Sequence, residues 1–311
     1  MTSGSSRADG SSRAGGLLVV GDVVTDVVAR HGSALARGTD TVAGIRTRAG
    51  GAGANVACWA ARSGCRDVRL LARAGADSAD WHRGLLARAG VRELLTVDEE
   101  APTGTVIALV DASAERTFLT DSGASLRLSP EDWSPSMLDG VARLHLSGYL
   151  FFAPPSRATA LLALREAGRR NIPVSVDPAS TGFLAHLGVD RFLSLVEGTG
   201  LLLPNADEAR MLTGLPEPAD AAAMLSLLVG DVVVTLGEGG ALLATAGTVT
   251  GRVPGNPVAA VDSTGAGDAF TGAFLAARLA GATPAEAAAA GCRAGAEAVL
   301  TVGGRPPLPP D

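Results

Sequence analysis

Short apolar runs alternate with longer Ala-rich stretches over most of this chain, and this alternation limits the possible folds more than any other feature. The short runs have the length and composition of buried strands, and the longer ones repeat apolar residues at helical spacing. The expected order is strand 17–20, a helix ending near 63, strand 68–72, helix 79–89, strand 144–146, helix 156–169, strand 173–176, helix 189–196, strand 200–203, helices 205–213 and 219–228, strand 232–236, the hairpin 241–244 with 248–253, and a helical C-terminus. The sequence therefore predicts an α/β fold in which a mainly parallel sheet has helices on both faces.

Two hairpin-like stretches interrupt this rhythm. Residues 27–48 are polar, contain glycine and have few helix formers, and residues 105–110 and 116–120 flank a turn-like segment. Such patterning is typical of antiparallel strands rather than of βαβ units. We therefore expect a small β-appendage at the edge of the core, formed by residues 26–48 and 101–121.

The composition excludes several kinds of chemistry. The chain has 311 residues, 47% of them hydrophobic, which is enough for one large α/β domain. All 26 residues counted as Lys or Arg are Arg. The absence of lysine excludes Schiff-base chemistry, pyridoxal phosphate attachment, the Walker A ammonium and the protein-kinase strand lysine.

Charge and targeting signals indicate a protein of the cytoplasm. The net charge is −6 without a block of like charges, so nothing in it indicates binding to nucleic acid. Residues 1–16 lack the apolar centre of a signal peptide and are predicted to be a disordered leader before a folded domain at 17–308. No apolar run reaches the ~18 residues that a membrane span needs. The three cysteines lack CxxC spacing, which favours free thiols in a reducing compartment.

The most informative segment is VDSTGAGDAFTGAF at 261–274. Its glycines allow successive backbone N–H groups to converge, and the helix that follows adds partial positive charge, so the segment can hold an anion. It is not a Walker A loop, because Ala273 stands where that loop needs lysine. Asp268 would repel a bound phosphate unless it takes a proton from an attacking hydroxyl group. The simpler interpretation is that Asp268 only complements the helix dipole.

We expect Gly267 to need a positive φ angle so that the amides of this loop can converge on an anion. Gly267→Val should then abolish any transfer of a phosphoryl group to the attacking hydroxyl group.

Three weaker segments accompany it. Gly50–Asn55 is a turn of small residues before a helix, through which the hydroxyl groups of a ligand can approach the backbone. Asn205 and Glu208 have the spacing of a capping box, which taken alone favours a purely structural role. The run 232–236 ends in a turn at Gly237.

Together these segments, in this order, resemble the ribokinase/PfkB family of carbohydrate kinases over residues 17–306. The segment 50–55 is similar to the first family signature, and DSTGAGD at 262–268 is similar to the second. The resemblance implies a ribokinase-like doubly wound α/β core with a β-lid, ATP as the phosphoryl donor, Mg²⁺, and an alcohol group of a sugar as acceptor.

The resemblance also implies a role for particular residues. These are Asp268 as catalytic base; the amides of Gly265, Ala266 and Gly267 as anion hole; Asn205 and Glu208 near Mg²⁺ and the triphosphate; Thr235 and Gly237 at the nucleotide; Asp26, Gly51 and Asn55 at the sugar; and Asp262, Thr264, Val299 and Gly304 around a monovalent cation such as K⁺.

The chain departs from many ribokinases at two places. It has Ala52 in the first glycine motif where many carry lysine, and Leu146-Ser147-Gly148 where many carry an acidic sugar ligand. Fructose, a keto-deoxy sugar acid and a nucleoside therefore stay open beside ribose. The alternatives are a nucleoside kinase, whose stacking pocket Phe118, Phe151 and Phe152 could supply, and a non-catalytic sugar or nucleotide sensor.

We expect the acceptor to be unphosphorylated, because the segments 50–56 and 262–272 contain no Arg that could bind a phosphate on the acceptor. If the acceptor does carry a phosphate, Arg116 in the lid hairpin is the first residue to test as its ligand. Exposed strands of the lid are expected to pair across a homodimer.

Overall fold

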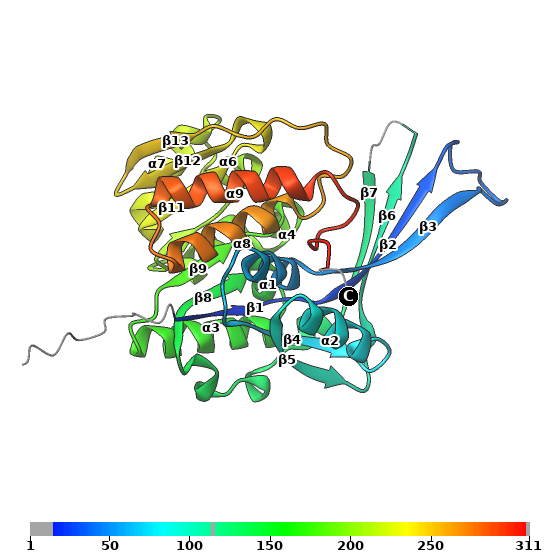
Figure 1. Ribbon diagram of the computed structural model, residues 1–311, viewed down its shortest axis with the longest axis horizontal. Helices are drawn as coiled ribbons and strands as arrows, with labels where there is room; N and C mark the ends of the chain where they lie inside the picture. Colours follow the sequence, from blue (N-terminus) through cyan, green and yellow to red (C-terminus); the bar gives the residue numbers. More distant parts are fainter. Residues whose placement is uncertain (1–14, 113–115, 309–311) are drawn as a thin grey trace, which may run out of the picture.

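A nine-stranded sheet forms the centre of the molecule in the computed structural model, which describes residues 15–112 and 116–308 (Figure 1). Its seven strands from β11 to β5 are parallel, and β12 and β13 form an antiparallel hairpin at one edge. Across the sheet the strands are β13 (Thr248–Val253), β12 (Ala241–Thr245), β11 (Asp231–Thr235), β10 (Leu201–Leu202), β9 (Val174–Asp177), β8 (Val141–Ser147), β1 (Gly16–Val20), β4 (Val68–Gly75) and β5 (Val91–Asp98). The predicted α/β fold with a mainly parallel sheet is confirmed.

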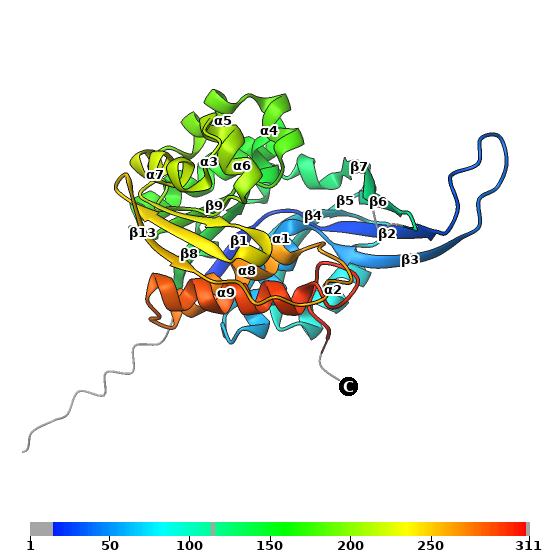
Figure 2. The same ribbon diagram turned by 90° about the horizontal axis from the view of Figure 1, so that it is seen from above.

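Helices cover both faces of this sheet, as Figure 2 shows. One face carries α1 (Ala52–Arg62), α2 (Ala79–Arg88), α8 (Ala266–Leu279) and α9 (Pro284–Ala298). The other carries α3 (Pro154–Arg169), α4 (Thr181–Leu187), α5 (Val189–Val196), α6 (Ala206–Thr213) and α7 (Pro218–Val229). On β1, Leu17 and Val19 pack under the first group, and Leu18 and Val20 under the second. A strand buried on both faces reads as a continuous apolar run, which is why β1 could be predicted.

The order of the strands reverses beside β1. From β1 the chain adds β4 and then β5 on one side, and later adds β8, β9, β10 and β11 on the other. The loops after β1 and β8 therefore leave the sheet in opposite directions, which opens a crevice at the carboxyl ends of these strands. The side chain of Ser147, at the end of β8, donates to Oδ1 of Asp22, just after β1, at 3.2 Å.

A second, four-stranded sheet stands beside this crevice and is called the lid sheet below. Its order is β3 (Ala43–Gly50), β2 (Val24–His31), β6 (Thr103–Val110) and β7 (Arg116–Gly123). Each predicted hairpin-like stretch supplies one antiparallel pair, and β2 and β6 join the pairs in parallel.

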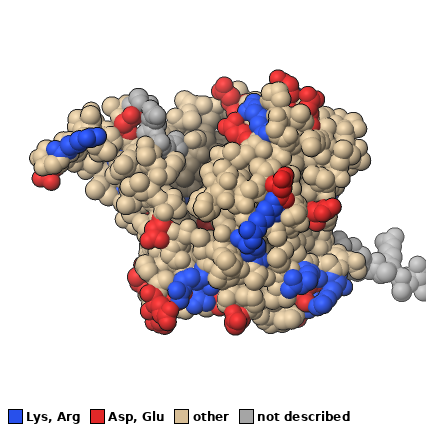
Figure 3. All heavy atoms as spheres, turned by 180° about the vertical axis from the view of Figure 1, so that it is seen from behind, with Lys and Arg blue, Asp and Glu red and all other residues tan. Residues whose placement is uncertain are grey.

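On the face of the molecule in Figure 3, acidic and basic side chains are interspersed, so this face shows no extended field of one sign.

The structure also differs from the sequence expectations. The edge strand β5 was not predicted from the sequence, because charged Arg92 and Glu93 break the alternation of its apolar residues. Residues 1–14 of the expected leader lie outside the described residues, whereas Gly16, also assigned to the leader, begins β1. Within the described residues, no helix is long and apolar enough to cross a membrane.

Helices α1 and α8 approach each other closely at Gly272. A Cβ atom added there would lie 2.5 Å from the carbonyl oxygen of Val56 and 2.8 Å from the nitrogen of Ala60. Gly272→Ala should therefore push the helices apart and lower the free energy of unfolding by roughly 1–3 kcal/mol. The measurement is urea unfolding followed by circular dichroism.

The matched control is Gly168→Ala in α3, where the added Cβ meets no atom within 4 Å. This change should leave stability unchanged or raise it by about 0.5–1 kcal/mol, because alanine favours helix. Equal effects of the two substitutions would contradict the close packing of α1 on α8.

Candidate active site

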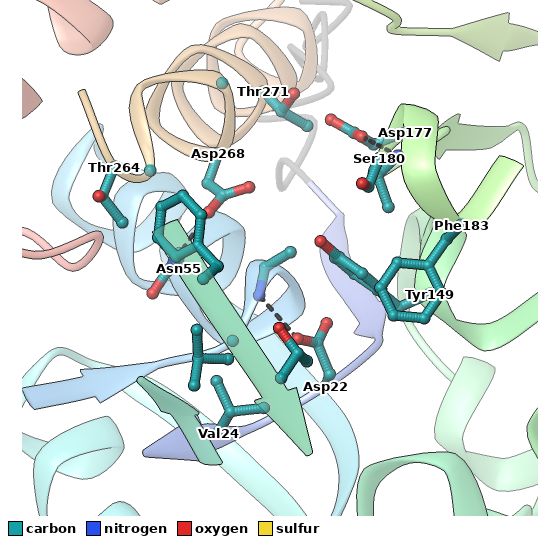
Figure 4. A pocket seen from close by; sticks show the side chains of 18 of the residues that line it. Asp22, Val24, Asn55, Tyr149, Asp177, Ser180, Phe183, Thr264, Asp268 and Thr271 are labelled. Atoms are coloured by element: carbon teal, nitrogen blue, oxygen red, sulfur yellow. Dashed lines mark hydrogen bonds between the residues drawn. The ribbon is translucent and has the colours of Figure 1, made fainter. Parts of the chain in front are cut away.

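A cavity of about 600 Å³ fills the crevice between the core and the lid sheet, and Figure 4 shows part of its lining. Its described lining includes five carboxylates and no Arg; the carboxylates are Asp22, Asp26, Asp177, Glu208 and Asp268. They come from the loop after β1, from β2, from the end of β9 and from the first turns of α6 and α8. The cavity is therefore strongly acidic, and a bound phosphate needs cations or backbone amides around it.

Asp268 lies in the first turn of α8, as predicted, and faces the cavity. The amide Nδ2 of Asn55, from α1, donates to its Oδ2 at 2.7 Å, while Oδ1 of Asn55 is buried without a partner among the described residues. Burial raises the pKa of Asp268 well above its usual value; the bond from Asn55 opposes this, and the charges of Asp177, Asp22 and Asp26 add to it. A carboxylate with a raised pKa is a stronger base once it is ionised.

The glycine-rich loop leads directly into α8. Gly265 caps the helix with φ +74°, and a Cβ there would lie 2.4 Å from Cα of Gly304. The expectation of a positive φ at Gly267 is wrong, because Gly267 already lies inside α8 and only Gly265 makes the left-handed turn. A Cβ on Gly267 would meet no protein atom within 4 Å and would occupy the cavity instead.

Asn205 and Glu208 form a reciprocal capping box at the start of α6. Oδ1 of Asn205 accepts from the amide of Glu208 at 2.9 Å, and Oε2 of Glu208 accepts from the amide of Asn205 at 2.9 Å. Both residues also line the cavity, as does Thr235 at the end of β11. Gly237 lies two positions further on, in a 3₁₀ turn outside the cavity lining. The structural and the functional interpretation of the pair are therefore compatible.

Asp177 was not predicted as a site residue. It lies between Asp268 on α8 and the capping box of Asn205 and Glu208 on α6. Its Oδ1 accepts from the amide of Ala179 at 2.8 Å, and its carboxylate is hydrogen-bonded by Thr271 of α8. Burial raises the pKa of Asp177 and that of Glu208, and the charge of Asp177 raises that of Glu208 further. Its position after an apolar strand was the signal available in the sequence.

On the opposite side of the cavity lie Asp22, Asp26 and Gly51. Asp22, also missed, accepts from the amides of Ala52 and Gly53 at 2.9 and 3.1 Å, and so caps α1. Gly51 is the N-cap residue of that helix. Asp26 lines the cavity from β2, and burial raises its pKa to about 7, against the opposing effect of Arg305.

Aromatic side chains form one wall of the cavity. Tyr149 and Phe183 pack edge to face with their ring centroids 5.2 Å apart, and Phe118 of the lid sheet lines the same cavity. In Figure 4, Tyr149 and Phe183 lie across the cavity from Asn55. Of the residues proposed for a stacking pocket, only Phe118 lines it, because Phe151 is buried in the core and Phe152 packs behind Phe183.

The four residues expected around a monovalent cation lie close together but are already hydrogen-bonded. Asp262 accepts from the amides of Thr264 and Gly303 at 2.9 and 3.0 Å. The carbonyl of Val299 accepts from the amides of Val261 and Asp262, and that of Gly304 from Nε1 of Trp59. Among the described residues, no group of three or more His, Cys, Asp or Glu side chains is arranged to hold a metal ion.

Comparison with known proteins gives the same family over nearly the whole chain. The sequence pattern described as "pfkB family carbohydrate kinase" matches residues 15–311. A fructokinase from Klebsiella pneumoniae is 32% identical over 274 residues, which are 84% of this chain and 84% of that protein. A ribokinase from Mus musculus is 32% identical over 272 residues, 84% of this chain and 81% of that protein.

Solved structures share the fold. A ribokinase from Thermotoga maritima superposes with a TM-score of 0.79 at 28% identity, covering 93% of this chain and 94% of that one. An adenosine kinase from Sinorhizobium meliloti gives a TM-score of 0.85 at 22% identity, covering 94% and 96%. A putative ribokinase II from E. coli in complex with ATP and Mg²⁺ gives 0.82 at 24% identity, covering 93% and 94%.

The two glycines of the loop should respond differently to substitution. Gly265→Ala forces a side chain into a left-handed turn beside Gly304, so it should lower stability by roughly 1–3 kcal/mol. Gly267→Val adds its side chain to open space, so the fold should keep its melting temperature while ATP binding is lost. Differential scanning fluorimetry and calorimetric titration with ATP measure the two effects. ATP binding by Gly267→Val at wild-type affinity would contradict the position of the phosphate at this loop.

Proposed function

The chain belongs to the pfkB family of carbohydrate kinases, and we propose that it transfers the γ-phosphoryl group of ATP to a primary hydroxyl group of a small, unphosphorylated sugar or sugar derivative. The observation that carries this proposal is the position of Asp268, in the first turn of α8 and facing an acidic cavity. A carboxylate beside an anion site favours proton abstraction over anion binding alone.

In the proposed step, the oxygen of the acceptor hydroxyl attacks the γ-phosphorus of ATP. Its proton passes to the carboxylate of Asp268, and the bond from the γ-phosphorus to the β,γ-bridging oxygen breaks, so that ADP leaves with both electrons of that bond. The bond from Asn55 fixes the carboxylate and leaves its other oxygen to take the proton. The raised pKa of Asp268 suits this base, because the proton is then held tightly as it is transferred.

The start of α8 stabilises the transferred group. The first N–H groups of a helix have no partner within it, and the helix dipole adds partial positive charge. Gly265 and Gly267 line the cavity, whereas Ala266 is outside the lining and its amide donates a long bond of 3.4 Å to the carbonyl of Ser263. In this proposal the amides of the three residues would hold the oxygens of the transferred phosphoryl group as charge develops on them. These donors need no lysine, in agreement with a chain that contains none.

The triphosphate and Mg²⁺ would lie on the side of Asn205, Glu208 and Thr235. Two buried carboxylates with raised pKa values, Asp177 and Glu208, face this part of the cavity and fit a divalent cation. Since no three-residue cluster is arranged for a metal in the described residues, phosphate oxygens and water would supply most of its ligands. When bound, Mg²⁺ supplies neutralisation of the charge that develops on the phosphates.

The acceptor would lie on the side of Asp26, Gly51 and Asn55, under the lid sheet. The described lining of the cavity contains no Arg, and the chain contains no Lys, so a phosphate on the acceptor would meet carboxylates without a cation. This composition favours an unphosphorylated acceptor. The side chain of Arg116, the exception named above, lies outside the described residues.

A nucleoside is the second candidate acceptor. The wall formed by Phe118, Tyr149 and Phe183 could stack a flat base, while Asp26 binds the hydroxyl groups of its ribose. A sugar, which has no flat group, would contact the same three rings through its C–H groups.

Four further features belong to this proposal. The lid sheet would exclude water from the phosphoryl donor, and its exposed edge strand β3 would pair with a second copy of the chain. A potassium ion bound by Asp262, Thr264, Val299 and Gly304 would use the remaining lone pairs of the carboxylate and of the two carbonyl oxygens, beside the hydrogen bonds that they already accept. Use of ATP favours a cytoplasmic location.

Asp268→Asn should remove most of the turnover and leave ATP binding intact. The substitution keeps the shape and removes the base, so kcat should fall by ~10²–10⁴-fold. Loss of a negative charge beside the triphosphate should leave ATP affinity equal or slightly tighter. A coupled assay of ADP release gives kcat, and calorimetric titration of the same preparation gives the affinity.

If Asp268 only complements the helix dipole, the same substitution lowers stability by ~0.3–1 kcal/mol and leaves kcat nearly unchanged. A normal kcat with a lowered melting temperature would therefore overturn the proposed base. Asp207→Asn is the matched control, because Asp207 lies in the first turn of α6, is exposed and pairs with Arg210. It should leave kcat unchanged.

The acceptor can be identified with a panel of free sugars, their phosphates and nucleosides. We expect kcat/KM to be highest for an unphosphorylated compound, and at least tenfold lower for its phosphorylated form, because the cavity lining offers no cation. Phe183→Leu should raise KM for a nucleoside more than for a simple sugar, by about three- to tenfold if the base stacks. A preference for a sugar phosphate would contradict the proposed acceptor class.

A further inference from the structure

Arg305, in the segment after α9, places a buried positive charge behind the acceptor side of the cavity. Its Nη2 donates to the carbonyl oxygen of Gly50 at 2.9 Å and lies 3.4 Å from Nδ1 of His82. Its Nε and Nη1 are buried and have no hydrogen-bond partner among the described residues. Such a guanidinium costs stability, because a buried cation whose N–H groups are unsatisfied loses its hydration. A purely structural role does not account for it.

The contacts of Arg305 lead to both strands that carry the acceptor site. Burial, and then the charge of Arg305, lower the pKa of His82 to about 3, so its ring is neutral. Since Nδ1 accepts from Arg305, Nε2 carries the proton and donates to Oγ1 of Thr25 at 3.3 Å. Thr25 precedes Asp26 on β2, and Gly50 precedes Gly51 at the end of β3.

Asp26 and Arg305 lie against the same glycine. A Cβ atom added to Gly50 would lie 2.2 Å from Oδ2 of Asp26, so this carboxylate packs directly on Gly50, whose carbonyl oxygen binds Arg305. Within the described residues no group donates a hydrogen bond to the carboxylate of Asp26, and the residue lines the cavity. Asp26 is therefore free to accept hydrogen bonds from a ligand, and it accepts more and stronger ones when it is ionised.

The other charges around this pair act differently. Asp22, in the loop after β1, and Asp262, before α8, are negative and favour protonation of Asp26. Arg48 lies opposite Asp26 in the register of β2 and β3, but it is exposed to solvent, which screens its charge. Next to Arg305 also lie His82, which is neutral, and the buried thiol of Cys58. Arg305 is thus the buried cation that opposes the two carboxylates.

We propose that Arg305 is a positioning residue that favours the ionised form of Asp26 and keeps its carboxylate open to the cavity, so that Asp26 accepts hydrogen bonds from hydroxyl groups of the acceptor. This inference rests on the proposed function, because it takes Asp26 as an acceptor-binding residue. Arg305 acts through Asp26 and the turn at Gly50, and it has no part in the transfer of the proton to Asp268.

The test is the pH dependence of steady-state kinetics for the wild type, Arg305→Met and Arg305→Lys. The acceptor used is whichever of D-fructose, D-ribose and adenosine gives the highest kcat/KM. For the wild type, KM for the acceptor should fall as pH rises, through an inflection near the pKa of Asp26, about 7. Ionisation of the base Asp268 should appear in kcat as well, which distinguishes it from that of Asp26. Without the cation the inflection should move up by about one pH unit, so KM at pH 7 rises several-fold and kcat changes less than about twofold.

Three comparisons make this result specific. Arg305→Lys should restore most of the wild-type profile, because the charge returns while the hydrogen-bond geometry does not. At pH 9.5 the KM of Arg305→Met should approach the wild-type value. The control Arg48→Met removes an exposed positive charge close by and should leave the inflection in place.

The double variant with Asp26→Asn separates this inference from the proposed function. In the Asp26→Asn background, Arg305→Met should cause no further change in KM, because no carboxylate is left to stabilise. If Asp26→Asn alone leaves KM unchanged, the proposed acceptor site is wrong, and the inference falls with it. If Asp26→Asn raises KM but the inflection stays in place in Arg305→Met, only the inference is overturned. Should Arg305→Met fail to fold, a shifted inflection in Arg305→Lys at an unchanged melting temperature would also overturn it.

Discussion

The hydrogen bond from Asn55 to Asp268 joins the first turns of two helices whose residues are 213 positions apart in the chain. It requires α1 and α8 to begin at the same place, and the close contact at Gly272 allows these helices to do so. The carboxylate of Asp22 caps the start of α1, and the left-handed turn at Gly265 precedes α8. These two contacts fix the loops that lead into the two helices. The proposed acceptor side and the proposed phosphoryl-transfer side of the cavity are therefore held in register by one pair of side chains.

The accumulation of negative charge is the second constraint on this cavity. Five carboxylates face one small volume, and burial raises the pKa of several of them. Without ligands, protonation lowers the repulsion between them. The Mg²⁺ ion proposed to accompany ATP would bring positive charge to one part of the cavity, and Arg305 supplies positive charge from behind another. In this proposal Asp177 and Glu208 are neutralised by a cation that binds from solution, whereas Asp26 is opposed by Arg305, a cation of the chain itself.

The sequence predicted those parts of the fold and of the candidate site that depend on local pattern. The apolar run of β1, the hairpins of the lid sheet and the segment 262–268 carry their own signals, and the strands and the start of α8 lie where these predicted them. Phe183 and Arg305 carry none, because their positions depend on which loops the strand order brings together. The expectation at Gly267 failed for a local reason: a pattern of three small residues does not show which of them makes the left-handed turn.

The parallel pair at the centre of the lid sheet has a consequence for folding. Strands β2 and β6 are joined only after β4, α2 and β5 have been laid down between them, so this pairing closes a long stretch of chain. Contacts of such high sequence separation form slowly, because the entropy of closing the loop is lost before the strands gain any hydrogen bonds. The two hairpins can form early and locally, but the surface that covers the acceptor arises only when they meet. A chain emerging from the ribosome therefore acquires this surface only after the β4–α2–β5 unit is complete.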